Sequence, residues 1–315
     1  MKKLTALLLS GALVLGLTAG CTSKPAPAPS QAADPQPSAG TTDGKVVIGL
    51  LVYNDKNEFI QKVVDGAQTK CNEYGYELIE YSADGDAATE VSNMEDLITK
   101  NPSVILYNPV DSDAAEAALS LANDANIPVI TVDRTANGGE VVSHVASDNV
   151  YGGKIAGEYI LAQLGEAGGE LVEIQGVAGT SAARDRGDGF HSAVDGAANV
   201  EVVVSQIGNW DKAQGMAIME NALQAHPDIK AVFAHNDTMA MGALEAATAA
   251  GREDIVIVGF DADDDAVQSV KDGKLGNTVA QQPQLMGSRG VELAYNYLND
   301  LPLEKEEAVE VALVK

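Results

Sequence analysis

Hydrogen-bonding side chains recur at one place in this sequence, directly after the short apolar runs that predict β-strands. The set consists of Asn57, Asn108, Asp133, Arg134, Arg184, Arg186, Asn236, Asp261 and Gln281. This mixture of amides, carboxylates and guanidinium groups offers both donors and acceptors, which suits a neutral ligand with several hydroxyl groups. A phosphate would be repelled by the carboxylates of Asp133 and Asp261. The pattern therefore predicts a site for a neutral polyol.

Two aromatic residues, Phe59 and Trp210, are candidates for the walls of such a site. The apolar C–H face of a sugar ring packs well on a flat aromatic ring. Trp210 is the only tryptophan, and it stands in the loop 207–211 after a predicted strand. This position favours contact with a ligand, and packing in the core is the alternative.

Each polar residue of the set also has a purely structural alternative. Asn108 and Asn236 could cap the helices that follow them, because their side chains accept hydrogen bonds from free backbone N–H groups. Asp133 and Arg134 could form a solvated turn, and Asp261 could favour the positive end of a helix dipole. Their shared location after successive strands favours a common binding site.

The elements that would position these residues alternate along the chain from residue 45. Short β-branched runs predict strands at 46–52, 77–81, 103–107, 128–132 and 141–145, and then at 170–175, 201–206, 231–234, 255–259 and 277–280. Helical patterns separate them, which is typical of parallel sheets with crossover helices. Two series of five strands predict an α/β fold with two doubly wound lobes. Ligands of such sheets bind outside the carboxyl ends of the strands.

Composition disfavours several other functions. The 315 residues include 46 acidic and 20 basic ones, so a formal net charge of −26 would repel nucleic acid. Cys21 and Cys71 are too far apart for a metal-binding knuckle, and the four histidines include no HxxxH pair. The glycine patterns of nucleotide-binding loops and of serine hydrolases are absent. We expect no metal, no cofactor and no nucleic-acid partner.

The first residues have the pattern of an export signal. Lys2 and Lys3 precede an apolar run at 4–17, which has the length of a signal-peptide core and is too short to span a bilayer. The run ends in a sequence that resembles a bacterial lipoprotein cleavage site, with Thr18 in place of the usual leucine. We predict a signal peptide at 1–20, a lipidated Cys21 and a Pro/Ala/Ser-rich tether at 21–43. Ordinary secretory cleavage, which leaves Cys21 as a free thiol, is the alternative.

Several stretches resemble the ribose-binding proteins of the periplasmic binding protein superfamily, the type I receptors of sugar ABC importers. The resemblance covers almost all of residues 45–315, and its most specific stretches are 108–114, 126–134, 139–149, 179–187, 234–237 and 258–261. It implies an extracytoplasmic, monomeric binding protein without enzymatic activity. Such a protein would deliver one monosaccharide, ribose or a related sugar, to an ABC permease and would contact the membrane only through its lipid.

The resemblance also implies which residues contact the sugar. They are Asn57, Phe59, Asn108, Asp133, Arg134, Arg186, Trp210, Asn236, Asp261 and Gln281. It selects Arg186 over Arg184, a choice that the strand pattern leaves open. The implied lobes are residues 44–147 plus 282–308 and residues 148–281 plus 309–315, joined by a three-strand hinge near 147–148, 281–282 and 308–311. Sugar would bridge the lobes and favour their closure.

Two positions depart from the pattern of the ribose-binding proteins. Ile60 stands where these proteins tend to have a second phenylalanine, and Trp210 is larger than the phenylalanine usual at its position. One wall of the site is therefore expected to be thinner and the other broader.

Two other classes of protein fit part of the pattern. The effector-binding core of a LacI-type repressor shares the fold, but a signal peptide and a proline-rich tether occupy the place of its DNA-binding domain. An enzyme acting on sugars would use Asp133 and Asp261 as paired carboxylates. Against it, the sequence offers no activated nucleophile, metal site or phosphate loop.

Overall fold

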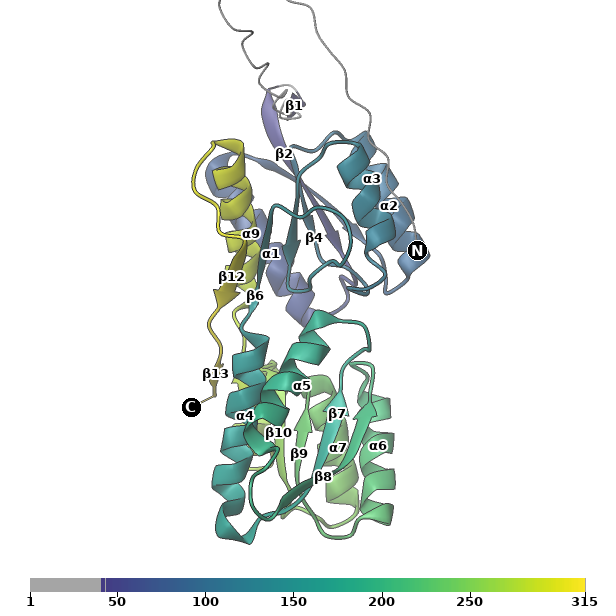
Figure 1. Cartoon of the computed structure of the whole chain (residues 1–315), viewed down its shortest axis with the longest axis vertical. Helices are drawn as coiled ribbons and strands as arrows, with labels where there is room; N and C mark the ends of the chain where they lie inside the picture. The colour runs from purple at the N-terminus through teal and green to yellow at the C-terminus, as the bar shows by residue number, and fades with distance from the viewer. Residues whose placement is uncertain (1–40, 43, 315) are drawn as a thin grey trace, which may run out of the picture. The chain divides into compact units, whose positions relative to one another are not determined.

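The computed structural model describes residues 41, 42 and 44–314 of the chain. The predicted signal peptide, Cys21 and the tether up to residue 40 lie outside these residues. The end of the predicted tether forms a short strand, β1 (Thr41–Thr42), which pairs antiparallel with Lys45 and Val46. The described residues build two α/β lobes, each around its own sheet (Figure 1).

The first lobe contains a parallel sheet with the strand order β3-β2-β4-β5-β6-β12. Its strands are β2 (Lys45–Val52), β3 (Glu77–Ser82), β4 (Val104–Tyr107), β5 (Val129–Val132), β6 (Ser143–Ser147) and β12 (Glu306–Val309). Helices α1 (Glu58–Tyr74) and α9 (Pro283–Leu298) pack on one face, and α2 (Ala87–Thr99) and α3 (Glu116–Asp124) pack on the other.

The second lobe contains a sheet with the order β8-β7-β9-β10-β11-β13, in which β13 alone is antiparallel to its neighbour. Its strands are β7 (Gly169–Gln175), β8 (Val200–Ile207), β9 (Ile229–Ala234), β10 (Val256–Asp261), β11 (Asn277–Ala280) and β13 (Ala312–Leu313). Helices α4 (Asn149–Leu164) and α5 (Ser181–Val194) pack on one face. Helices α6 (Lys212–Ala225), α7 (Asp237–Ala249) and α8 (Asp264–Lys271) pack on the other.

Side-chain alternation along the central strands explains why both faces of each sheet are covered. In β2, Ile48, Leu50 and Val52 belong to the core beneath α1 and α9, whereas Leu51 belongs to the core beneath α2 and α3. All four are fully buried, as expected for a central strand of a parallel sheet. The cores fix the strands, so the residues that follow the strands are the ones available to a ligand.

All ten strands predicted from the sequence are present, and no end differs by more than two residues. The largest difference is at the strand predicted for residues 141–145. The observed strand β6 begins two residues later, because its pairing with β5 starts only at Ser143. The short strands β1, β12 and β13 were not predicted. β12 contains two glutamates in four residues, so its apolar alternation is weak.

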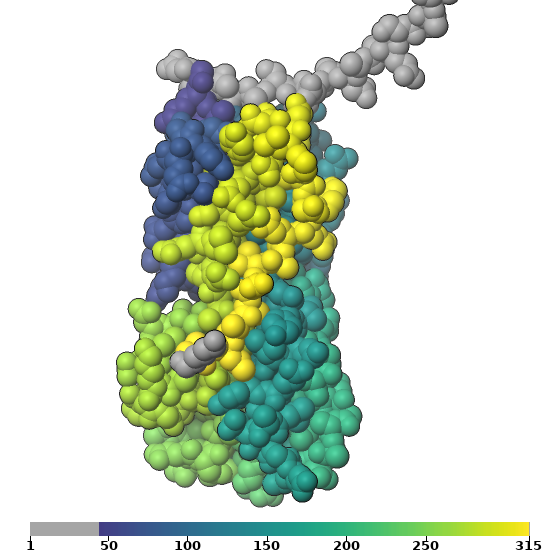
Figure 2. Space-filling view, turned by 90° about the vertical axis from the view of Figure 1, so that its left-hand side faces the viewer, coloured from purple at the N-terminus to yellow at the C-terminus, as the bar shows by residue number. Residues whose placement is uncertain are grey.

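The chain passes between the two sheets three times, after β6, after β11 and after β12. The C-terminal segment, in yellow, runs along one side of both lobes in Figure 2. Counted within its lobe, each sheet has the strand order 2-1-3-4-5, followed by one C-terminal strand at the edge. In this order, ligands bind at the switch point between the first and third strands.

Candidate functional site

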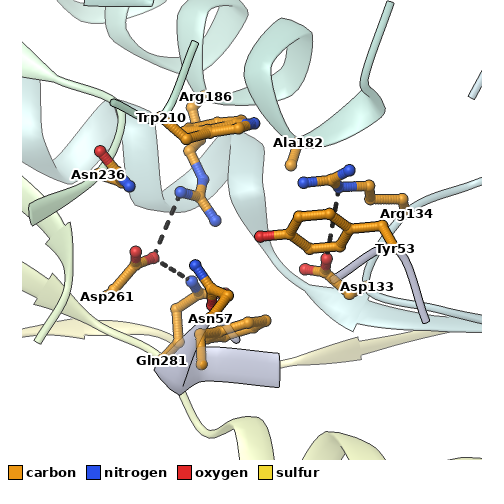
Figure 3. A pocket seen from close by; sticks show the side chains of 11 residues that line it. Tyr53, Asn57, Asp133, Arg134, Ala182, Arg186, Trp210, Asn236, Asp261 and Gln281 are labelled. Atoms are coloured by element: carbon orange, nitrogen blue, oxygen red, sulfur yellow. Dashed lines mark hydrogen bonds and ion pairs between the residues drawn. The ribbon is translucent and has the colours of Figure 1, made fainter. Parts of the chain in front are cut away.

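A pocket lies between the carboxyl ends of strands from the two sheets (Figure 3). It is lined by Tyr53, Asn57, Phe59, Asp133, Arg134, Ala182, Arg186, Trp210, Asn236, Asp261 and Gln281. Its empty volume is about 360 Å³, including the part that opens to solvent. Nine of the ten site residues predicted from the sequence lie in this lining. The exception is Asn108.

Two asparagines of the lining also cap helices. Asn57 precedes α1, and its Oδ1 accepts a hydrogen bond from the Ile60 N–H at 3.2 Å. Asn236 precedes α7, and its Oδ1 accepts from the Met239 N–H at 3.0 Å. The helix uses only the amide oxygen, so the Nδ2 group of each residue can donate into the pocket. The capping alternative for Asn236 is therefore correct and compatible with a place in the site.

Asp133 and Arg134 form a buried pair after β5 and not a solvated turn, since their side chains are 7% and 5% exposed. Arg134 Nη1 donates to the carbonyl oxygens of Pro109 at 3.2 Å and Val110 at 2.9 Å. Its guanidinium carbon lies 3.8 Å from the centre of the Tyr53 ring. The backbone and this ring hold the guanidinium in place, so its remaining N–H groups are oriented before any ligand arrives.

Asn108 lies behind the pocket, although the resemblance implied that it contacts the ligand. It is fully buried, and its Nδ2 donates to the Val132 carbonyl at 2.9 Å and to Asp133 Oδ2 at 3.0 Å. Its Oδ1 accepts from the Tyr53 N–H at 3.4 Å. Both amide hydrogens are thus used within the protein, and the residue caps no helix, since α3 begins only at Glu116. Asn108 positions Asp133 and Tyr53.

Arg186, in α5, contacts three hydrogen-bond acceptors and the rings of Phe260 and Trp210. Its Nε donates to Asn149 Oδ1 at 2.9 Å, and its Nη1 donates to the His235 carbonyl at 2.5 Å. Nη1 also forms an ion pair with Asp261 Oδ1 at 3.4 Å. The guanidinium carbon lies 3.7 Å from the centre of the Phe260 ring. No described residue accepts a hydrogen bond from Nη2, which leaves this nitrogen for a ligand.

Asp261 ends β10 and faces the pocket. Its Oδ1 accepts from Gln281 Nε2 at 2.6 Å and pairs with Arg186. Burial raises the pKa of Asp261 to about 7, although Arg186 acts in the opposite direction, and the nearby Asp263 carboxylate adds to the rise. Helix α8 begins only at Asp264, so the alternative that Asp261 belongs to the start of a helix is wrong.

Trp210 lies over one side of the pocket in Figure 3 and also packs against the core of the second lobe. Core packing, one of the two predicted alternatives, is therefore correct, and the residue also lines the pocket. Its ring is seated on Gly176, where an added Cβ would come within 1.9 Å of the indole Cη2. Ile60, expected to form a thinner opposite wall, is fully buried in the core of the first lobe and does not line the pocket.

Three buried polar atoms of the lining have no hydrogen-bond partner among the described residues. They are Arg134 Nε, Trp210 Nε1 and Gln281 Oε1. Buried polar atoms in folded proteins are nearly always paired, and an unpaired one costs free energy. At this pocket two donors, on Arg134 and Trp210, and one acceptor, on Gln281, are therefore free to pair with a polar ligand.

Tyr53 and Ala182 line the pocket but were not predicted as site residues. Tyr53 directly follows β2, so the rule that found the other residues applies to it as well. Burial raises the pKa of Tyr53 to about 12, which keeps the hydroxyl protonated. Ala182 is a small residue in the first turn of α5. Its side chain has no polar group, so the sequence offered no reason to place it in a binding site.

The lobes also contact each other directly beside the pocket. The Ser112 N–H donates to the Gly179 carbonyl at 3.2 Å, and the Ser181 N–H donates to Ser112 Oγ at 3.1 Å. The Thr135 N–H donates to Ser181 Oγ at 3.0 Å. Ser112 and Thr135 follow strands of the first lobe, whereas Gly179 and Ser181 follow β7. These bonds hold the two sides of the pocket together.

Two further features are absent from the part of the chain that the structure describes. No three His, Cys, Asp or Glu side chains there are grouped so that they could hold a metal ion. No helix among the same residues combines the length and the apolar character needed to cross a membrane.

Comparison with known proteins gives three findings. Residues 48–302 match the family model described as a periplasmic binding protein domain. The ribose import binding protein RbsB of Escherichia coli (strain K12) is 47% identical over 270 residues, which cover 86% of this chain and 90% of that protein. The protein of the same name from Haemophilus influenzae is 42% identical over 314 residues, or 100% of this chain and 99% of that protein.

Solved structures give the same fold. An ABC transporter periplasmic solute binding protein from Actinobacillus succinogenes 130z, with bound D-allose, superposes with a TM-score of 0.80 at 27% identity. The match covers 86% of this chain and 98% of that chain.

Proposed function

The chain belongs to the periplasmic binding protein family, and we propose that it binds one monosaccharide, D-ribose or a related sugar, between its two lobes. Like its relatives, it is a binding protein of a sugar importer and not an enzyme. The sugar would be delivered to an ABC permease. The identity to the ribose import binding proteins and the geometry of the pocket support this proposal.

The observation that carries the proposal is the set of oriented, unpaired polar groups around the pocket. A sugar hydroxyl both donates and accepts, so it can pair with the amides of Asn57 and Asn236 and with the carboxylates of Asp133 and Asp261. About three or four charge-assisted hydrogen bonds, at ~1.5–3 kcal/mol each, together with stacking on Trp210, reach the ~8 kcal/mol of micromolar binding.

Closure around the sugar follows from the distribution of these groups. We infer that residues 44–147 plus 282–308 and residues 148–281 plus 309–315 move as two units about the three crossings of the chain. The first unit carries Asn57, Asp133 and Arg134, and the second carries Arg186 and Asp261. Because a sugar contacts both sets only when the lobes meet, it shifts the population toward the closed form. A permease could recognise that form.

A thermal-shift screen of single sugars tests the proposed function. A ligand that binds only the folded protein raises its melting temperature by mass action. We expect one pentose or similar monosaccharide, among ribose, xylose, arabinose, allose and galactose, to give the largest increase in Tm. The disaccharide sucrose serves as the control and is expected to give none, because a second ring would prevent the lobes from making their contacts beside the pocket. Equal melting temperatures with and without every monosaccharide would contradict the proposal.

Attachment to the membrane is proposed through the lipid of Cys21 alone, with the body of the protein a monomer outside the cytoplasm. The sequence 17–21 and the proline-rich stretch after it support this assignment. In cells, Cys21→Ser is expected to move the protein from the membrane fraction to the soluble extracytoplasmic fraction, as immunoblotting of the fractions would measure. Cys71→Ser is the matched control and should leave the protein with the membrane. An unchanged distribution of the Cys21→Ser variant would contradict lipidation.

A further inference from the structure

A buried carboxylate, Glu173, lies in β7 and does not line the pocket. Its Oε1 is 3.0 Å from His235 Nε2, and its Oε2 accepts from Ser205 Oγ at 2.6 Å and from Gln175 Nε2 at 2.9 Å. His191 Nε2 also lies 3.3 Å from Oε2. Burial opposes ionisation, but these hydrogen bonds lower the pKa of Glu173 to about 2. Glu173 is therefore a fixed negative charge in the interior of the second lobe.

His235 is held in one orientation by groups at both ring nitrogens. Its Nδ1 lies 3.3 Å from the backbone nitrogen of Gly176, which can only donate. Nδ1 is therefore the acceptor, and Nε2 carries the proton that it donates to Glu173. Burial lowers the pKa of His235, which favours this neutral tautomer. A carboxylate that receives the N–H of a histidine fixes both the tautomer and the ring.

The fixed ring is connected to three parts of the pocket lining. The carbonyl of His235 accepts from Arg186 Nη1 at 2.5 Å. The next residue is Asn236, which lines the pocket. Gly176, whose N–H the ring accepts, is the surface on which the indole of Trp210 rests. A shift of His235 would thus move a guanidinium, an amide and an aromatic wall at the same time.

We propose that Glu173 and His235 are a positioning pair, which fixes the second lobe's half of the sugar site through His235's backbone carbonyl and through Gly176. The pair touches no ligand, and this inference rests on the proposed sugar binding. Its consequence is that the hydrogen bond between Glu173 and His235 contributes to affinity and not only to the stability of the fold.

Two amide variants separate these contributions. The side chain of His235→Gln reaches far enough to donate to Glu173, whereas that of His235→Asn is too short. We expect His235→Asn to weaken the Kd for D-ribose at least about tenfold, and His235→Gln to stay within about threefold of the parent. Titration calorimetry gives both values. The emission maximum of Trp210 in the sugar-free protein should shift in His235→Asn, because Glu173 no longer holds the side chain at position 235.

The chain offers a matched control in His226, which is paired with Glu170 at 3.6 Å in the same lobe, outside the pocket lining. His226→Asn should leave both the Kd and the emission unchanged. If His235→Asn lowers Tm but leaves the Kd for D-ribose and the emission of Trp210 as in the parent, the pair is only structural and the inference is wrong. If the parent itself does not bind D-ribose, the proposed ligand fails instead, and the emission of the His235→Asn variant still decides whether the pair positions the site.

Discussion

Arg186→Ala is expected to abolish sugar binding, with a Kd weakened by at least about 1000-fold. The change removes the Nη2 group that faces the pocket and leaves Asp261 without the ion pair at 3.4 Å. Each charge-assisted hydrogen bond contributes ~1.5–3 kcal/mol, and every ~1.4 kcal/mol changes the Kd tenfold. Titration calorimetry with D-ribose measures the loss. Arg186→Lys keeps the charge without the planar fork and should give an intermediate loss.

Arg184→Ala is the matched control, two residues away in the same helix. Arg184 is half exposed, pairs with Asp185 at 3.2 Å and does not line the sugar pocket. Its replacement should leave the Kd unchanged. Far-UV circular dichroism and Tm show whether each variant is folded. A folded Arg186→Ala protein that binds sugar as the parent does would contradict the assignment of the site.

The second large effect is expected at Asp261, whose charge should control binding as the pH falls below about 7. Its raised pKa of about 7 means that roughly half of the sugar-free molecules carry the protonated acid at neutral pH. Sugar hydroxyls that donate to the carboxylate stabilise the charged form and lower its pKa in the complex. Binding therefore releases a proton. The affinity should fall as the pH falls through 7, by up to about tenfold per pH unit.

Asp261→Asn removes this charge with little change of shape. Its Kd for D-ribose should be weakened about 100-fold, because an amide cannot accept both from Arg186 and from sugar hydroxyls as a carboxylate can. The residual binding should vary little between pH 6 and pH 8. Asp265→Asn, on the exposed side of α8, is the control and should retain the affinity and the pH dependence of the parent. An unchanged pH profile in Asp261→Asn would assign the dependence to another group.

The fold was largely predictable from the sequence, because its signals are local. Apolar β-branched runs such as residues 46–52 and 255–259 fill the centres of the sheets, and their spacing by helical patterns fixes the parallel order. The same rule, that polar residues after strands meet at one edge of a sheet, led to most of the pocket lining. Strand β12 was missed because its pairing with β6 depends on residues about 160 positions away, and its own pattern is mostly charged.

Sequence reasoning failed for residues whose role depends on the orientation of their side chains. Asn108 follows a strand as Asp133 does, but its amide turns inward to Val132 and Asp133 and so lies behind the pocket. Tyr53 was not predicted, although it directly follows β2 and its hydroxyl can both donate and accept. The role of His235 could not be predicted, because it depends on a hydrogen bond to Glu173, which lies 62 residues earlier in the sequence.

A crystal structure of the protein with the sugar that raises its Tm most would test the central claim most directly. We predict one unmodified monosaccharide between the lobes, with Asn57 and Asp133 on one side of it and Arg186 and Asp261 on the other. Sugar bound at another surface, or held by residues of one lobe alone, would contradict the account.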